Sequence, residues 1–183
     1  SRTYDTSQPS VTLSSASANP INAPFPVTAT FSESTTNFVV GDITVTNGVA
    51  GSFSGSGTTY TFTVTPSAQG LVSVDVAAGV ATDAAGNGNT VATTLSRTYD
   101  SAQPSVTLSS TSTNPTNTSP IPVSATFSES VTNFVVGDIT VTNGVASNFA
   151  GGPSVYTFDV TPSGQGLVSV NVAAGVATDA AGN

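Results

Sequence analysis

The chain has 183 residues, and its 10 acidic side chains against 2 basic ones give a formal net charge of −8 at pH 7. This balance argues strongly against a nucleic-acid partner, because neutralising phosphates requires Lys and Arg gathered on one face. Cys, Met, Trp and His are all absent, which excludes disulfides, thiol nucleophiles, Cys/His zinc sites and imidazole catalysis, while 37% hydrophobic residues suffice for small β cores.

Apolar residues alternate with Thr and Ser along the first half of the chain, as in Val27, Ala29 and Phe31. A period of two is typical of half-buried β-strands, and no window carries a helical period. The alternation and the intervening turn residues predict seven strands, in chain order 11–15, 26–32, 38–46, 49–53, 59–65, 71–77 and 90–95.

Two short motifs sharpen this prediction in the middle of the module. Asn47-Gly48 is the pair that two-residue hairpin turns prefer, so the strands 38–46 and 49–53 are predicted to form a hairpin. Gly41-Asp42 predicts a bulge or bend within the long strand 38–46, since Gly inside a strand often marks one.

The second half of the chain repeats the first. SRTYD at residues 1–5 returns at residues 96–100, and the offset of 95 becomes 96 after one insertion near Ser119. Two longer segments recur at the second offset: NFVVGDITVTNGVA at 37–50 and 133–146, and VAAGVATDAAGN at 76–87 and 172–183. Such near-identity establishes a tandem duplication and suggests a longer array.

The duplication predicts two modules in series. The first covers residues 1–95, with an entry linker at 1–8, and the second covers residues 96–183, with an inter-module linker at 96–103. About seven short strands in each module indicate an all-β chain of two tandem immunoglobulin-like antiparallel β-sandwiches. The second module has no counterpart of the strand 90–95, so we expect it to expose a sheet edge that a following repeat or another chain completes.

The run FSES…NFVVGDITVTNG…YTFTVTP…VAAGVATDAAGN…YD resembles the bacterial Ig-like repeats found in tandem in very large surface proteins and adhesins. The resemblance covers both modules almost end to end. It implies a structural stalk or filament repeat of a secreted protein, located outside the bacterial cell or on its surface, and not an enzyme. The implied partners are neighbouring copies of the repeat, which lateral pairing or strand exchange could bring together.

Acidic side chains are expected to gather at the entry pole of each sandwich, because strand direction brings the relevant loops there. Glu33 follows the second strand, Asp83 and Asn87 lie in the loop after the sixth, and Asp5 precedes the first. The equivalent set in the second module is Asp100, Glu129, Asp179 and Asn183. Oxygen ligands without nitrogen or sulfur suit calcium, so we predict a calcium site at each pole that stiffens the joint.

Calcium at inter-module linkers is also known among repetitive bacterial adhesins, which the chain resembles. The alternative for these acids is simple solvation. Residues Asp83 to Asn87 could equally form an Asx-stabilised turn in which Gly86 takes a positive φ.

Two other functions remain open from the sequence. A carbohydrate-binding or adhesive recognition module would present flat aromatic rings, but Trp is absent and the alternation around Tyr60 and Phe62 predicts that both rings are buried. Glu33 with Asp83 is the arrangement that a glycosidase could use, although no aromatic cleft accompanies it. No stretch approaches the roughly 18 apolar residues that a membrane span requires.

Overall fold

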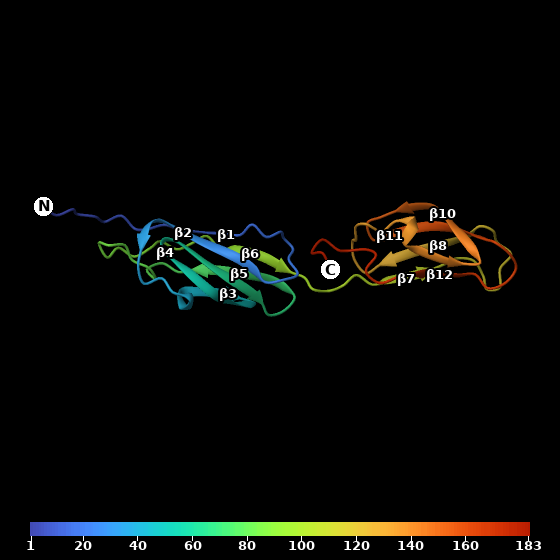
Figure 1. Cartoon of the computed structure of the whole chain (residues 1–183), viewed down its shortest axis with the longest axis horizontal. Helices are drawn as coiled ribbons and strands as arrows, with labels where there is room; N and C mark the ends of the chain where they lie inside the picture. Colours follow the sequence, from blue (N-terminus) through green and yellow to red (C-terminus); the bar gives the residue numbers. More distant parts are fainter. The chain divides into compact units, whose positions relative to one another are not determined.

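The computed structural model describes all 183 residues and forms two compact units, Ser1–Ser101 and Ala102–Asn183 (Figure 1). Apart from two single turns of 3-10 helix, the regular structure of both units is β-strand, and every strand pair is antiparallel. The predicted all-β class is therefore confirmed. No helix of the structure has the length and apolar character that a bilayer crossing requires.

The first unit is a sandwich of two three-stranded sheets. One sheet has the order β1 (Val11–Ser14), β2 (Phe25–Thr35), β4 (Gly48–Pro66). The other has the order β3 (Ile43–Thr46), β5 (Gly70–Val76), β6 (Leu95–Tyr99). The alternating apolar residues of both sheets meet between them, as the period of two requires.

The second unit repeats this plan without a counterpart of β6 and with two strands in the place of β4. Its larger sheet has the order β10 (Gly144–Gly151), β11 (Val155–Pro162), β8 (Ile121–Phe127), β7 (Val106–Ser109). Its smaller sheet contains only β12 (Ser169–Val172) and β9 (Ile139–Thr142). The second unit has no strand equivalent to β6, so β12 pairs on one side alone, as the sequence predicts.

The predicted hairpin at Asn47-Gly48 is wrong. β3 pairs with β5, and β4 pairs with β2, so the chain crosses from one sheet to the other at this turn. Asn47 has φ 59°, and its side-chain NH2 donates to the carbonyls of Ala68 and Leu71 at 2.7 and 3.3 Å. These bonds tie the turn to the start of β5 and direct the chain across the sandwich. Asn143 repeats the arrangement in the second unit.

The predicted strand 38–46 is shorter in the structure. Residues Val40–Asp42 form a turn of 3-10 helix (η1), and β3 begins only at Ile43. The Asp42 carboxylate accepts a hydrogen bond from the Val39 N–H at 2.9 Å, which closes the turn. Val136–Asp138 (η2) forms the same turn in the second unit. Gly41-Asp42 therefore does mark a bend, but the bend precedes the strand.

The strands predicted at 49–53 and 59–65 are one element, β4, in the first unit. Gly55 has φ 118°, and a side chain there would collide with the backbone of Thr59 and Tyr60, which shows how closely the two halves of β4 approach. The second unit has two strands in the same place, β10 and β11, which pair with each other. The predicted division into two strands is therefore correct for the second unit and wrong for the first.

The last strand of the first unit lies four to five residues later than predicted. Residues 90–94 run beside the sandwich without strand structure, and β6 occupies Leu95–Tyr99. Residues 96–99, which the sequence assigns to the inter-module linker, therefore belong to the first unit, and that unit extends to Ser101.

A group of aromatic rings packs edge to face in the core of each unit. In the first unit Phe31, Phe38 and Tyr60 lie with ring centroids 5.1–5.8 Å apart. The Tyr60 hydroxyl donates to the carbonyl of Thr35 at 3.0 Å, so the one polar atom of the group is paired. Tyr60 and Phe62 are both buried, which confirms the prediction for these rings.

Candidate functional site

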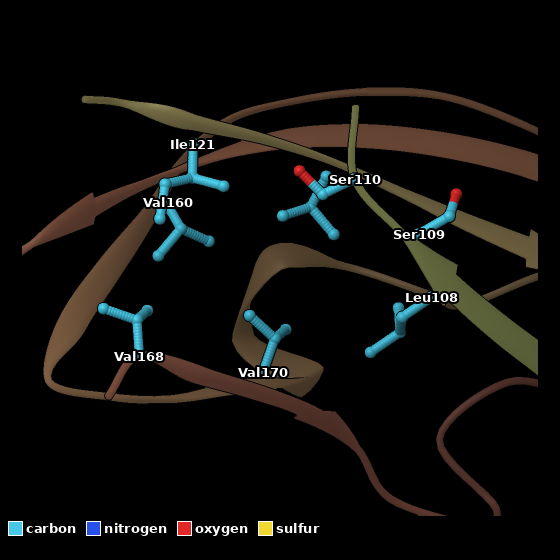
Figure 2. A pocket seen from close by; sticks show the side chains of 8 residues that line it. Leu108, Ser109, Ser110, Ile121, Val160, Val168 and Val170 are labelled. Carbon is cyan, nitrogen blue, oxygen red and sulfur yellow. The ribbon is translucent and has the colours of Figure 1, made fainter. Parts of the chain in front are cut away.

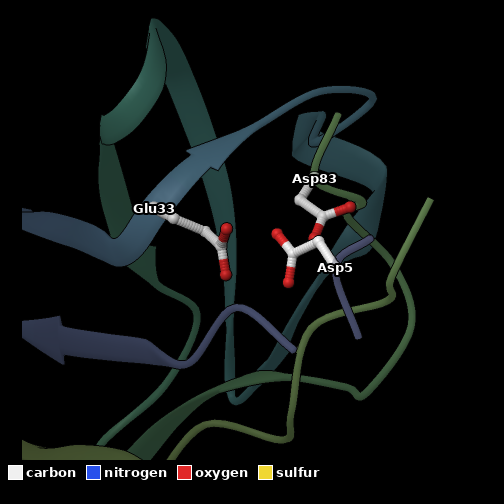
Figure 3. Close-up of side chains that lie close together, drawn as sticks. All are labelled: Asp5, Glu33 and Asp83. Carbon is white, nitrogen blue, oxygen red and sulfur yellow. The ribbon is translucent and has the colours of Figure 1, made fainter. Parts of the chain in front are cut away.

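Three carboxylates converge in the first unit. Asp5 lies ahead of β1, Glu33 lies near the end of β2, and Asp83 lies in the loop after β5. One oxygen of each carboxylate lies within 4.8 Å of the others, and the three side chains point toward one another (Figure 3). Strand direction thus brings together residues that are up to 78 positions apart in sequence (83 − 5).

The loop Asp83–Asn87 is built around the Asp83 side chain. One carboxylate oxygen accepts the backbone N–H groups of Ala85 and Asn87, both at 2.8 Å, and the other accepts the Asn87 side-chain NH2 at 2.8 Å. Gly86 has φ 95°, a conformation that glycine adopts without strain. The Asx-stabilised turn that the sequence left open as an alternative is therefore present.

These bonds also define the charge state of Asp83. The side-chain hydrogen bond from Asn87 has the largest effect on the pKa of Asp83 and lowers it, backbone N–H groups lower it further, and burial opposes them. The pKa of Asp83 lies below its ordinary value as a result. Asp83 is 6% exposed and ionised at neutral pH, so a fixed negative charge sits at the base of the cluster.

The pKa of Glu33 is shifted in the opposite direction, above its ordinary value. Burial raises its pKa most, and the negative charges of Asp83 and Asp5 raise it further. Its carboxylate accepts no hydrogen bond within the protein, so nothing offsets the repulsion. The basic side chains do not compensate either, because Arg97 donates to the carbonyls of Ser15 and Ser96 and Arg2 forms no ion pair.

Asp5 and Asn87 connect the entry segment to this loop. The Asp5 carboxylate accepts the Ser7 N–H at 2.9 Å, and the Asn87 side-chain NH2 donates to the backbone carbonyl of Asp5 at 3.2 Å. The amide of Asn87 thus holds Asp83 and Asp5 through its nitrogen. Asn87 was predicted as an oxygen ligand, and in this arrangement its NH2 group donates to the Asp83 carboxylate and to the backbone carbonyl of Asp5.

The second unit reproduces the loop. One oxygen of Asp179 accepts the backbone N–H groups of Ala181, Gly182 and Asn183 at 2.7–2.9 Å, and the other accepts the Asn183 side-chain NH2 at 2.9 Å. Burial acts to raise the pKa of Asp179, but these hydrogen bonds outweigh it and the pKa is lowered.

Two further predicted residues complete the second set. Glu129 is half-buried just after β8, in the place that Glu33 occupies in the first unit. Asp100 follows β6, where its N–H donates to the carbonyl of Ile21 at 2.8 Å and its carboxylate accepts the side-chain NH2 of Gln69 at 2.9 Å. Asp100 is the residue equivalent to Asp5 at the offset of 95.

The first cluster has the chemistry and the size that a hard divalent cation requires. Its donors are carboxylate oxygens, and calcium takes oxygen ligands at roughly 2.3–2.6 Å, so two ligands on opposite sides of one ion lie about 5 Å apart. A spread of at most 4.8 Å matches that separation. The Asp83 oxygen that accepts only the Asn87 side-chain NH2 keeps a lone-pair direction for an ion, whereas the other oxygen already accepts two N–H groups.

The aromatic side chains offer no sugar-binding platform. Tyr60 and Tyr156 are buried, and Tyr99 packs against the core of the first unit from β6. Tyr4 is 91% exposed and is the one aromatic ring with a large exposed fraction. A lone ring on the entry segment gives the carbohydrate-binding hypothesis no support.

Sequence reasoning missed Asn89, which is 1% exposed in the first unit. Its side-chain oxygen accepts the Ala81 N–H at 2.8 Å, and its NH2 donates to the carbonyls of Ala77 and Thr90 at 2.9 and 2.8 Å. Asn89 anchors the segment that leads into β6. A signal existed in the run Gly86-Asn87-Gly88-Asn89, but its turn composition hides a buried residue.

Comparison with protein families gives one model, described as a bacterial Ig-like domain, which matches residues 5–99 and again residues 100–183. The two matches cover nearly the whole chain and coincide with the duplication. No curated protein and no solved structure matches the chain.

Proposed function

Because the chain belongs to the bacterial Ig-like domain family, we propose that it forms two structural repeats of a bacterial surface stalk, adhesin or filament in which calcium stiffens the entry to each repeat. Tandem domains of this family usually serve as extracellular or surface repeats, and they are typically structural or adhesive. The cluster of Asp5, Glu33 and Asp83 is the observation that carries the calcium part of the proposal.

The mechanism follows from where the ligands lie in the chain. Asp5 belongs to the segment that enters the sandwich, whereas Glu33 and Asp83 belong to the sandwich itself. An ion shared by all three would fix the entry segment to the first unit. Asp100, Glu129 and Asp179 would act in the same way at the entry to the second repeat, since Asp100 corresponds to Asp5.

Electrostatics favours the ion for the same reason that it disfavours the empty cluster. Burial, and after it the charges of Asp83 and Asp5, raise the pKa of Glu33, so the ionised form of Glu33 is disfavoured in the empty cluster. A divalent cation would convert this repulsion into attraction. Bound calcium would supply the positive charge, and the chain supplies the three carboxylate ligands and their spacing. We expect an affinity on the order of 0.1 to 1 mM, as in other extracellular modules.

Calcium titration of the full chain tests the proposal. We expect excess calcium to raise the unfolding temperature relative to the chelated protein, and small-angle scattering to show a narrower distribution of extensions. Magnesium at the same concentration should do less, because it demands a tighter octahedral shell. Unfolding and scattering curves that do not respond to chelator would contradict the calcium role, while leaving the structural role of the repeats untouched.

A further inference from the structure

The last strand of the first unit is held on both of its edges. β6 pairs antiparallel with β5 on one edge, and residues 19–21 cover the other. The Ile21 N–H donates to the Thr98 carbonyl at 2.9 Å, and the Asp100 N–H donates to the Ile21 carbonyl at 2.8 Å. The Asn19 side-chain oxygen accepts the Thr98 N–H at 2.7 Å. Both backbone groups of Thr98 are therefore bound to this short segment, which closes the outer edge of β6.

Gln69 makes a second attachment at the point where the chain leaves β6. Its side-chain NH2 donates to the Asp100 carboxylate at 2.9 Å, and its side-chain oxygen accepts the Ser101 N–H at 2.6 Å. Gln69 directly precedes β5, so it ties the two residues that follow β6 to the strand with which β6 pairs. Ile21 is 7% exposed and belongs to the hydrophobic core, which anchors the first attachment. We call Asn19, Ile21 and Gln69 the latch of the first unit.

The latch and the carboxylate cluster lie at opposite poles of the first unit. β2 begins at Phe25, four positions after Ile21, and reaches Glu33, which lies beside Asp5. The eight residue steps from Phe25 to Glu33 (33 − 25) span roughly 26 Å of strand. The chain therefore enters the unit at one pole and leaves it from β6 at the other (Figure 1).

Tension applied along the chain between these two poles acts along β6. The hydrogen bonds of β6 to β5 and to residues 19–21 lie across the strand, so tension along the strand loads them together in shear. Bonds loaded together fail in one step, whereas bonds at a frayed strand end open one at a time. The latch adds bonds at the end of β6 that the tension reaches first, and it opposes fraying there.

We propose that β6 is the strand that bears tension in the first unit, and that Asn19, Ile21 and Gln69 hold it against forced release. The proposal rests on the proposed structural role of the repeats only for its use in an array, because the resistance belongs to the fold of one unit. All tests are made in chelator, so that they do not depend on the proposed calcium sites, one of which includes Asp100.

Force spectroscopy on the full chain tests the latch. The chain has no Cys, so single introduced thiols can carry the handles. Handles at Ser1→Cys and Gln103→Cys direct the tension through β6. At fixed force we expect Asn19→Ala and Gln69→Ala each to speed the unfolding of the first unit about fivefold, and the double variant to speed it about twentyfold. Unchanged unfolding rates in both single variants would overturn the proposal.

The second unit supplies the matched controls. Asn114 and Gln165 are equivalent to Asn19 and Gln69, and both are exposed and make no side-chain hydrogen bond. With the same handles, Asn114→Ala and Gln165→Ala should leave the unfolding rate of the first unit unchanged. Acceleration equal to that of the latch variants would overturn the assignment to the latch.

A second pair of handles separates load bearing from a general contribution to stability. With handles at Ser1→Cys and Ser67→Cys, in the turn between β4 and β5, the tension leaves the unit before it reaches β6. The latch variants should then change the unfolding rate by less than about twofold, because β6 is still held when the other strands separate. Equal acceleration with both pairs of handles would overturn the proposal, since it would show that the latch contributes to stability alone.

Discussion

The two units differ in one strand while their sequences are nearly the same. Val72, Val74 and Val76 have no exposed surface in the first unit, and their counterparts in β12 are partly exposed in the second. Ala81 is 0% exposed, whereas Ala177 is partly exposed. The hydrophobic pattern of a strand therefore predicts which side chains can be buried, and the presence of a neighbouring strand determines whether they are buried.

The largest effect is expected for Asn89→Ala, which removes a residue that the second unit lacks. The substitution leaves the buried Ala81 N–H without a partner, which costs about 1–3 kcal/mol, and it also removes the part-buried hydrogen bonds to the carbonyls of Ala77 and Thr90. We expect the free energy of unfolding of the first unit to fall by roughly 3 kcal/mol, with the second unit unchanged. Denaturant unfolding followed by amide exchange in β5 and β12 separates the two units.

Asn22→Ala is the matched control for this variant, because Asn22 is exposed and makes no side-chain hydrogen bond. A loss below about 1 kcal/mol for Asn89→Ala would mean that Asn89 does not anchor the last strand.

The next effect compares equivalent valines directly. Val74→Ala opens a cavity in a sealed core, and we expect it to lower the free energy of unfolding by about 2 kcal/mol. Val170 is partly exposed and lines an open cavity (Figure 2), so Val170→Ala should cost less than about 1 kcal/mol. Amide exchange of each unit's own strands measures both values in the same chain. Equal losses would show that the second unit buries β12 as fully as the first buries β5.

A smaller effect distinguishes the carboxylate cluster from ordinary surface acids. In chelator, Glu33→Gln should slightly stabilise the first unit, because it removes the charge that burial and the neighbouring carboxylates disfavour. In calcium the same variant should bind the ion on the order of tenfold more weakly, since affinity follows the number of charged ligands. Calorimetric titration and thermal unfolding measure the two effects.

Asp75→Asn is the control for Glu33→Gln, because it removes one negative charge outside the cluster and the second repeat already has Asn171 at this position. Its calcium affinity should equal that of the unchanged chain. Loss of affinity to the same extent in both variants would indicate a general charge effect and no defined site.

The smallest effect is a dependence on pH. The pKa of Asp83 is lowered in the folded state, so the stability from its hydrogen bonds is complete above the unfolded value of about 4 and is lost as pH falls through the folded value. The raised pKa of Glu33 has the opposite effect on the pH dependence of stability. Protonation of Glu33 relieves repulsion, so the first unit in chelator should gain slightly as pH falls from 7 through the folded pKa of Glu33.

Thermal unfolding across pH 3 to 7 checks both signs, with Glu33→Gln expected to abolish the gain and leave the acid-side loss. A first unit whose stability rises steadily down to pH 3 would contradict the hydrogen-bonded state of Asp83.

Sequence alone was sufficient for the features that depend on local pattern and repetition. The period of two located β1, β5 and the inward faces of Tyr60 and Phe62, and the duplication identified two equivalent modules. Strand direction also placed Asp5, Glu33 and Asp83 at one pole, where the structure has them. Calcium binding there stays a prediction.

The features that the sequence missed depend on contacts between distant segments. The Asn47-Gly48 pair indicates a turn, but whether the strands on either side pair with each other depends on the bonds from Asn47 to Ala68 and Leu71. The strand β6 was misplaced because its residues Leu95–Tyr99 include Arg97, which reads as solvent-exposed. Its guanidinium is half-buried against Ser15, a partner 82 positions away.

The position of β6 has a practical consequence for dividing such arrays into single domains. A fragment ended at Leu95 would retain one of the five residues of β6, whereas a fragment ended at Ser101 would retain them all. A shift of six residues in the end of the fragment therefore decides whether an isolated repeat contains the strand that completes its smaller sheet or leaves one edge of β5 unpaired.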